Sequence, residues 1–356
     1  MTLVIAEAGV NHNGSDELAY ELVDAAYQAG ADIVKFQTFK AKNIVTEEAE
    51  QAEYQITNSG QKESQFSMLK RLELSYDTHH KLVKYCHDLG IEFLSTAFDS
   101  ESLEFLVNDL GITRLKLPSG EITNAPLVLE HARTDCDLIV STGMATLAEI
   151  EQVLSVIAFG YLNKSDTPTD ELLQAAYFSD EGKRLLKQKV TLLHCTTEYP
   201  APYSDINLNA MDTMADSFKL AVGYSDHSEG ITVPIAAVAK GAVLIEKHFT
   251  VDKNLPGPDH KASLDPIELK AMVEGIRTVE KVLGDGIKGP RPSEVKNKAV
   301  ARKSLVAAKD IAVGEPFSVT NIAVKRPGNG INPIHFWRYL GSQSQQNYKA
   351  GDLINE

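Results

Sequence analysis

The stretch LAVGYSDHSEGITVPIAAVAKGAVLIEKHFT (residues 220–250) holds two short apolar runs that each end in polar residues, with a helical pattern between them. Apolar runs of this length that alternate with helices are typical of parallel strands buried on both faces of a sheet. One run leads into His227 and the other ends at His248. Each histidine could simply end a core strand, or the two could meet around a metal ion, and this stretch leaves both interpretations open.

The same pattern occupies most of the chain. Six earlier runs resemble these two: LVIAEAG (3–9), IVKFQTF (33–39), EFLSTAF (92–98), RLKLPSG (114–120), LIVSTG (138–143) and VTLLHCTT (190–197). Helical patterns separate them, including 16–29 and 76–89, and a last one covers 266–283. Eight strand–helix units within residues 1–285 predict a (β/α)8 TIM barrel rather than an open doubly wound sheet.

The composition changes after the barrel. Residues 286–302 carry Gly, Pro and mixed charge without an apolar stripe, which predicts a linker. Residues 303–356 contain short β-type runs broken by Gly and Pro, which predicts a small β-rich domain. A core this small benefits from a further surface to pack on.

Charge and cysteine content limit the function. The chain has 35 Lys and Arg against 49 Asp and Glu, a net charge of −14, so we expect neither nucleic acid nor an anionic membrane as a partner. The three cysteines lack CxxC spacing, which favours a reducing compartment over a disulfide framework or a thiolate zinc site. The first apolar run lacks a basic start and is interrupted by Glu7, so we expect no signal peptide. No later stretch approaches the roughly eighteen uncharged apolar residues of a membrane span, so we expect none. With the cysteine pattern, this predicts a cytoplasmic location.

Most of the predicted strands end in polar residues. In a barrel the carboxyl ends of all strands meet at one mouth, where active sites are built. Such residues could merely satisfy loop backbone groups, but their occurrence along the whole series favours a shared site. They include Glu7, Lys35, Gln37, Thr96, Lys116, Ser119, Ser141, Thr196, Thr197, Ser225, His227, Lys247 and His248.

Lys35 and Lys116 stand where a central strand would ordinarily carry another Val or Ile. A buried lysine needs a charged partner. That partner could be Glu7 or Glu121 in an internal salt bridge, or an anionic ligand that the neighbouring hydroxyls also bind. Because no Walker-type glycine loop is present, the anion would be a small phosphorylated metabolite rather than a nucleotide. The two glutamates could act as general acid or base, or only neutralise the lysines.

The histidines divide by position. The last two strands of a barrel are neighbours, so His227 and His248 could form an open Lewis-acid metal site. His12 could cap a loop or line the site, and His194 is predicted to be a core residue. Four others fall in predicted helices and are expected at the surface: His79, His80, His87 and His131. Asp259 in LPGPDHKAS (255–263) and Tyr199 in YPAPY (199–203) suit a turn and a binding site equally well.

Ten motifs, in order, resemble the sialic acid synthase family of bacterial nonulosonate synthases: AEAGVNHNG, VKFQTF, STAFD, KLPSGE, STGM, HCTTEYPAP, GYSDHS, EKHFT, LPGPDH and KRPGNGI. The resemblance implies a (β/α)8 barrel followed by an antifreeze-like (SAF) domain. It also implies condensation of phosphoenolpyruvate with an open-chain N-acetylated mannose-type sugar and water, which releases phosphate and gives a nine-carbon 2-keto acid.

The resemblance also implies roles for individual residues. His227 and His248 would hold Mn2+ or Mg2+, and Glu7 and Glu121 would handle water and protons. Contacts to phosphoenolpyruvate would come from Lys35, Thr96 and Lys116 at its carboxylate and from Ser119, Ser141 and Ser225 at its phosphate, to which Thr197 can also donate. Contacts to the sugar would come from Gln37, Phe98, Tyr199 and Asp259.

Arg326 in KRPGNG resembles an arginine that reaches the barrel mouth of a partner subunit near the sugar N-acetyl group. It implies a domain-swapped homodimer, although Lys-Arg before Pro-Gly is also ordinary for a solvated turn.

The identity of the sugar depends on a local departure from the family pattern. We expect N-acetylmannosamine as the substrate and N-acetylneuraminate as the product. However, residues 196–200 read TTEYP, where sialic acid synthases often have TNIYP. This variant resembles relatives that act on 2,4-diacetamido-2,4,6-trideoxymannose to give N,N'-diacetyllegionaminate. Rival hypotheses are a metal-dependent hydrolase, a synthase of shorter 2-keto sugar acids and a non-catalytic carbohydrate-binding protein.

Overall fold

A computed structural model describes residues 1–52, 55–56 and 62–355. The chain forms two compact units, Met1–Gly284 and Asp285–Glu356.

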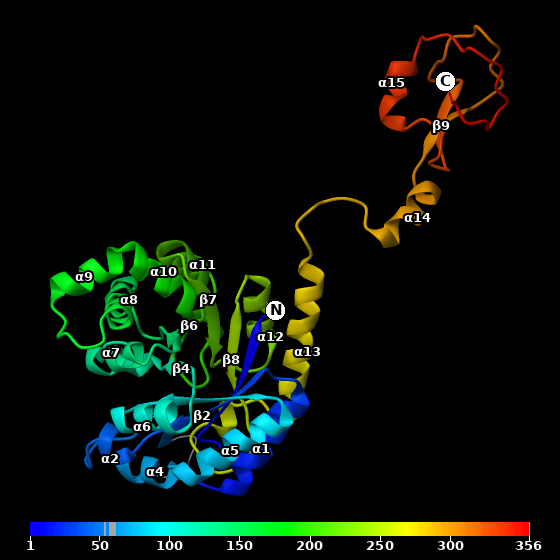
Figure 1. The fold of residues 1–356 in the computed structure, drawn as a ribbon. Coiled ribbons are helices and arrows are strands. Elements are labelled where there is room, and N and C mark those ends of the chain that lie inside the picture. Colours follow the sequence, from blue (N-terminus) through cyan, green and yellow to red (C-terminus); the bar gives the residue numbers. More distant parts are fainter. Residues whose placement is uncertain (53–54, 57–61, 356) are drawn as a thin grey trace. The chain divides into compact units, whose positions relative to one another are not determined.

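The first unit is built on a closed barrel of eight parallel strands that follow one another in sequence order (Figure 1). The strands are β1 (Leu3–Gly9), β2 (Ile33–Thr38), β3 (Glu92–Ala97), β4 (Arg114–Leu117), β5 (Asp137–Ser141), β6 (Val190–Cys195), β7 (Ala221–Asp226) and β8 (Leu244–His248). The TIM barrel predicted from the alternating runs is confirmed.

Helices connect the strands. They are α1 (Asp16–Ala29), α2 (Ala41–Ile44), α4 (Gln65–Leu72), α5 (Tyr76–Leu89), α6 (Ser100–Glu104), α7 (Ala125–Arg133), α8 (Leu147–Leu162), α9 (Asp170–Phe178), α10 (Asp180–Lys189), α11 (Ala210–Phe218), α12 (Thr232–Ala239) and α13 (Pro266–Leu283). Short turns are η1 (Phe105–Asp109), η2 (Ser119–Glu121), η3 (Tyr203–Asp205) and η4 (His260–Ala262). Local sequence fixes several helix starts: Thr146 and Asp265 each cap a first turn with a reciprocal glutamate three residues on.

An apolar cluster fills the amino-terminal half of the barrel interior. It consists of Ile5, Ile33, Leu94, Ile139, Leu193 and Leu244, all buried. Side chains two residues apart on a strand point the same way. The next inward layer therefore contains polar residues, among them Glu7, Lys35 and Thr96, and the barrel has a closed base below a polar interior.

The second unit is small and β-rich, as expected. It begins with α14 (Pro292–Ala301), which lies in the segment expected to be a linker. An antiparallel pair, β9 (Ser304–Ala307) and β10 (Ile322–Lys325), is followed by η5 (Pro333–His335) and α15 (Phe336–Tyr339). Its buried cluster is Leu305, Ala307, Ile311, Phe317, Ile322, Tyr348 and Ile354.

The prediction that all four helical histidines lie at the surface is wrong for two of them. His79 and His131 are fully buried. Each ring Nδ1 donates to the carbonyl one helical turn earlier, of Ser75 and Leu127 respectively, at 2.8 Å. This local bond satisfies one polar atom of the ring and allows it to pack against the barrel. Within the described residues, no helix is long and apolar enough to cross a membrane.

Candidate active site

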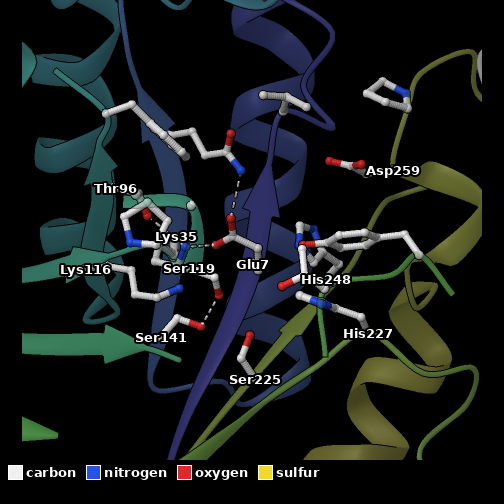
Figure 2. A pocket seen from close by; sticks show the side chains of 18 of the residues that line it. Glu7, Lys35, Thr96, Lys116, Ser119, Ser141, Ser225, His227, His248 and Asp259 are labelled. Carbon is white, nitrogen blue, oxygen red and sulfur yellow. Dashed lines mark hydrogen bonds and ion pairs between the residues drawn. The ribbon is translucent and has the colours of Figure 1, made fainter. Parts of the chain in front are cut away.

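A cavity of about 270 Å³ opens at the carboxyl ends of the barrel strands (Figure 2). Most residues predicted for the site line it: Glu7, Lys35, Gln37, Thr96, Phe98, Lys116, Ser119, Ser141, Thr197, Tyr199, Ser225, His227, His248 and Asp259. The structure thus brings together residues that are up to about 250 positions apart in the chain, as expected for a barrel mouth.

The floor of the cavity is a network of lysines and glutamates. Lys35 Nζ lies 2.6 Å from Glu7 Oε2 and 3.5 Å from Glu246 Oε2, and Lys116 Nζ lies 2.8 Å from Glu246 Oε1. Lys35 also donates to Thr96 Oγ1 at 3.0 Å. The internal salt bridge to Glu7 is therefore present, and both lysines still face the cavity.

Glu246 was missed by the sequence analysis. It lies on β8 two residues before His248, so both side chains point to the barrel interior. That spacing is the signal that could have identified it. Ser225 donates to Glu246 Oε1 at 2.8 Å, which links the glutamate to the neighbouring strand.

The pKa values of the two floor carboxylates are shifted in opposite directions. Burial raises the pKa of Glu7, and the nearby Lys35 only partly offsets this. Burial would also raise the pKa of Glu246, but Lys116 and Lys35 outweigh it and lower that pKa. Glu246 is therefore the ionised partner of the two lysines, whereas Glu7 is suited to hold and release a proton.

A group of hydroxyls lies beside the lysines. Ser119 Oγ donates to Ser141 Oγ at 2.9 Å, and the backbone N–H of Gly143 donates to Ser119 Oγ at 3.1 Å. A Cβ atom at Gly143 would lie only 2.3 Å from Thr197 Oγ1 and 2.7 Å from Ser119 Oγ. Gly143, which the sequence analysis did not single out, is thus the residue that lets three hydroxyl-bearing loops converge.

The two histidines face each other, with ring centroids 5.6 Å apart. His227 Nδ1 lies 2.7 Å from the Thr196 carbonyl, which can only accept, so Nδ1 carries the proton and Nε2 keeps its lone pair. His248 Nδ1 is buried and has no hydrogen-bond partner among the described residues. Burial, reinforced by the neighbouring His227, holds the pKa of His248 well below its usual value and keeps that ring neutral.

These features suit an open metal site. Burial would lower the pKa of His227, but the Cys195 thiol and the Thr196 carbonyl outweigh it and raise that pKa. The Nε2 atom of His227 and the neutral ring of His248 are suitable ligands for a divalent cation, which would displace any second proton from His227. Across the part of the chain that the structure describes, no group of three or more His, Cys, Asp or Glu residues is arranged to hold a metal ion. A metal at His227 and His248 would therefore keep several coordination positions for water and substrate.

The outer part of the cavity has a polar side and an apolar side. Asp259 and Tyr199 lie near the histidines; burial, with the Glu7 charge, raises the pKa of Asp259 to about 6. An apolar wall is formed by Val10, Met68, Leu69, Leu72 and Phe98, which pack in one cluster. Three of these come from α4, in the segment between β2 and α5 for which no element was predicted.

Three candidates fall outside the described cavity lining. Glu121 follows the lining residue Gly120 in η2, and its carboxylate accepts from Asn124 at 2.7 Å. Arg326 belongs to the second unit, where its Nε donates to the Ala301 carbonyl at 3.1 Å. His12 is buried and accepts from the Gly14 N–H at 3.0 Å, which fits the loop-capping interpretation. The roles of Glu121 and Arg326 stay predictions.

Barrel, cavity and second unit define a two-domain enzyme. The NeuB family model matches residues 22–288, and the SAF domain model matches residues 302–355. An N,N'-diacetyllegionaminic acid synthase of Campylobacter jejuni is 49% identical over 100% of this chain and 99% of its own length. One from Legionella pneumophila is 47% identical over 99% and 92%. The structure of a sialic acid synthetase from Leptospira borgpetersenii in complex with citrate matches with a TM-score of 0.66 and 31% identity over 83% of this chain and 90% of that chain.

The chain therefore belongs to the NeuB family of nonulosonic acid synthases. Its second unit is the SAF domain that the sequence motifs implied.

Proposed function

We propose that this enzyme condenses phosphoenolpyruvate with 2,4-diacetamido-2,4,6-trideoxymannose and water to give N,N'-diacetyllegionaminate and phosphate. The observation that carries this choice of sugar is the level of identity to relatives of different specificity. The two legionaminic acid synthases are 49% and 47% identical, whereas a human N-acetylneuraminate-9-phosphate synthase is 29% identical. The comparison favours this sugar over N-acetylmannosamine, which was our first expectation.

The floor of the cavity supports the assignment of phosphoenolpyruvate. Lys35, Thr96 and Lys116 would bind its carboxylate, and Ser119, Ser141, Ser225 and Thr197 its phosphate. Glu246 already offsets part of the lysine charge. A substrate that brings both a carboxylate and a phosphate therefore calls for additional positive charge nearby.

His227 and His248 would hold that charge as Mn2+ or Mg2+. When bound, such an ion acts as a Lewis acid that polarises the sugar aldehyde. This chain contributes two imidazoles to the ion, and the bond to the Thr196 carbonyl fixes the orientation of His227.

The outer part of the cavity offers contacts to the proposed sugar. Gln37, Tyr199 and Asp259 offer hydrogen bonds to hydroxyl and amide groups, and Gln37 Nε2 is held by Glu7 Oε1 at 3.4 Å. The apolar wall that includes Phe98 and Leu69 matches a 6-deoxy sugar. Burying a methyl group against apolar atoms costs less free energy than burying a hydroxyl that finds no hydrogen-bond partner.

The proposed reaction forms a bond from C3 of the enol to the aldehyde carbon. Water then adds at C2, and the resulting tetrahedral intermediate expels phosphate. Glu7 is 2% exposed and has a raised pKa, so it can exchange a proton with the reacting groups. Glu121 is the second acid that we propose for handling water and protons.

We also propose that the enzyme is a domain-swapped homodimer in which Arg326 acts on the partner's barrel. His227→Ala and Arg326→Ala chains, each inactive alone, should regain activity after subunit exchange. An inactive mixture in which exchange has been verified would contradict this arrangement.

The sugar assignment is tested by measuring phosphate release from phosphoenolpyruvate with each of the two sugars. We expect kcat/KM for the diacetamido sugar to exceed that for N-acetylmannosamine by at least about tenfold, the scale on which pockets discriminate small groups. An equal or higher value for N-acetylmannosamine would overturn it.

A further inference from the structure

The outward faces of β7 and β8 carry a second ion pair that the reaction does not use. Asp226 and Lys247 are register partners on these two strands, and Lys247 Nζ lies 2.7 Å from Asp226 Oδ2. Both side chains are 0% exposed. Because side chains alternate along a strand, this pair points away from the cavity that the flanking residues line.

Every polar atom of this pair has a partner. Asp226 Oδ1 accepts from the Tyr224 hydroxyl at 3.0 Å, from the Ser228 N–H at 2.9 Å and from Ser228 Oγ at 2.7 Å. Lys247 Nζ also donates to the Ser228 carbonyl. Ser228 is therefore bound through its amide, its hydroxyl and its carbonyl to one buried charge pair.

Stability alone does not account for this arrangement. Removing two charges from water costs free energy that their attraction only partly returns, and well-packed apolar residues at such sites are often as stable or more so. A buried, fully bonded pair does, however, restrict the backbone to one geometry, because breaking any bond leaves a buried charge unpaired.

The backbone that this pair restricts is that of the two histidines. His227 stands between Asp226 and Ser228, both of which belong to the network. His248 follows Lys247 directly, and its carbonyl accepts from the Leu264 N–H at 2.9 Å. One buried ion pair thus joins the two residues that precede the histidines.

We propose that Asp226 and Lys247 are positioning residues that set the spacing of His227 and His248 for a divalent metal. This inference rests on the proposed function, which assigns the metal to these histidines.

The test replaces both charges by apolar residues of similar size, Asp226→Leu with Lys247→Met. Mn2+ is titrated calorimetrically into chelator-stripped protein, and thermal unfolding is recorded without metal. We expect Mn2+ affinity to fall about 10- to 100-fold, as when other groups that orient metal ligands are removed. The metal-free protein should remain folded with a lower melting temperature, because the buried polar groups of Tyr224 and Ser228 lose their bonds to the pair.

A matched control removes the pair Asp32–Arg277. This pair joins the residue before β2 to α13, with an N–O distance of 2.6 Å. Asp32→Asn with Arg277→Met should change stability without changing Mn2+ affinity. A milder variant, Ser228→Ala, keeps the ion pair and removes one bond to Asp226; it should weaken Mn2+ binding about threefold, and it serves if the double variant does not fold.

The outcomes separate the two proposals. Wild-type protein that fails to bind Mn2+ would overturn the assigned metal site and this inference with it. Wild-type affinity in a folded Asp226→Leu/Lys247→Met protein, or in Ser228→Ala if the double variant does not fold, would overturn the positioning role alone.

Discussion

The two faces of β7 and β8 use buried charge in opposite ways. On the outer face, Asp226 and Lys247 form a pair in which each polar atom is bonded within the protein. On the inner face, Glu246 is shared by two lysines, and its Oε2 is reached only by Lys35 at 3.5 Å. His248 Nδ1 lacks a hydrogen-bond partner among the described residues. A completed network of this kind restricts the backbone to one geometry, whereas an incomplete one is suited to receive a ligand.

The alternation of side chains along a strand produces this difference. Ser225 and Glu246 are register partners on the inside, and Asp226 and Lys247 are the next pair, on the outside. A one-residue shift of register would exchange the two networks, which is why the surrounding bonds must fix the register.

The largest effect is expected from breaking the inner network. Lys116→Met removes a proposed substrate contact and leaves Glu246 with the Ser225 hydrogen bond and the longer ion pair to Lys35. We expect kcat/KM for phosphoenolpyruvate to fall at least about a hundredfold, the scale of losing one partner of a buried charge pair. Steady-state phosphate release measures it. Lys240→Met, which removes a partly exposed pair to Asp212, should leave activity unchanged.

A smaller effect is expected from changing the cluster of serine and threonine hydroxyls on the inner face. Gly143→Ala introduces a Cβ that must displace Thr197 or Ser119. We expect KM for phosphoenolpyruvate to rise about tenfold, equivalent to about 1.4 kcal/mol. Gly120→Ala is the matched control, because Gly120 also lines the cavity but a Cβ there meets nothing within 4 Å. Equal effects of the two changes would contradict the role of Gly143.

The smallest effect concerns a buried group outside the site. Burial lowers the pKa of His131 to about 4, so below its ordinary value of about 6.5 the unfolded chain binds more protons and stability falls. Between pH 7 and 5.5 this single residue should remove about 1 kcal/mol of unfolding free energy. His131→Leu should reduce the loss by that amount in urea titrations, whereas replacing the exposed His87 should not. An unchanged pH dependence in His131→Leu would show that the buried imidazole does not titrate as inferred.

Much of the architecture was predictable from the sequence because the relevant signals are periodic. Apolar runs separated by helices predicted the barrel, and polar residues at the strand ends predicted much of the cavity lining, including Lys35, Ser141 and Ser225. Both signals depend only on spacing along the chain.

What escaped prediction depends on contacts between distant segments. Glu246 becomes part of the site only because two other strands place lysines beside it. Gly143 matters because the side chains of Ser119 and Thr197 approach its backbone. His79 and His131 were assigned to the surface because their bonds to preceding carbonyls, which allow burial, are not visible in the residue type.

In the proposed condensation, phosphate leaves only when both substrates and the metal are present. It is tested most directly by following phosphate release from phosphoenolpyruvate by chelator-stripped enzyme while the diacetamido sugar and Mn2+ are added separately and together. We expect release only with both present, matched by an equal amount of nine-carbon 2-keto acid. Release without sugar, or full activity after verified removal of metal, would contradict it.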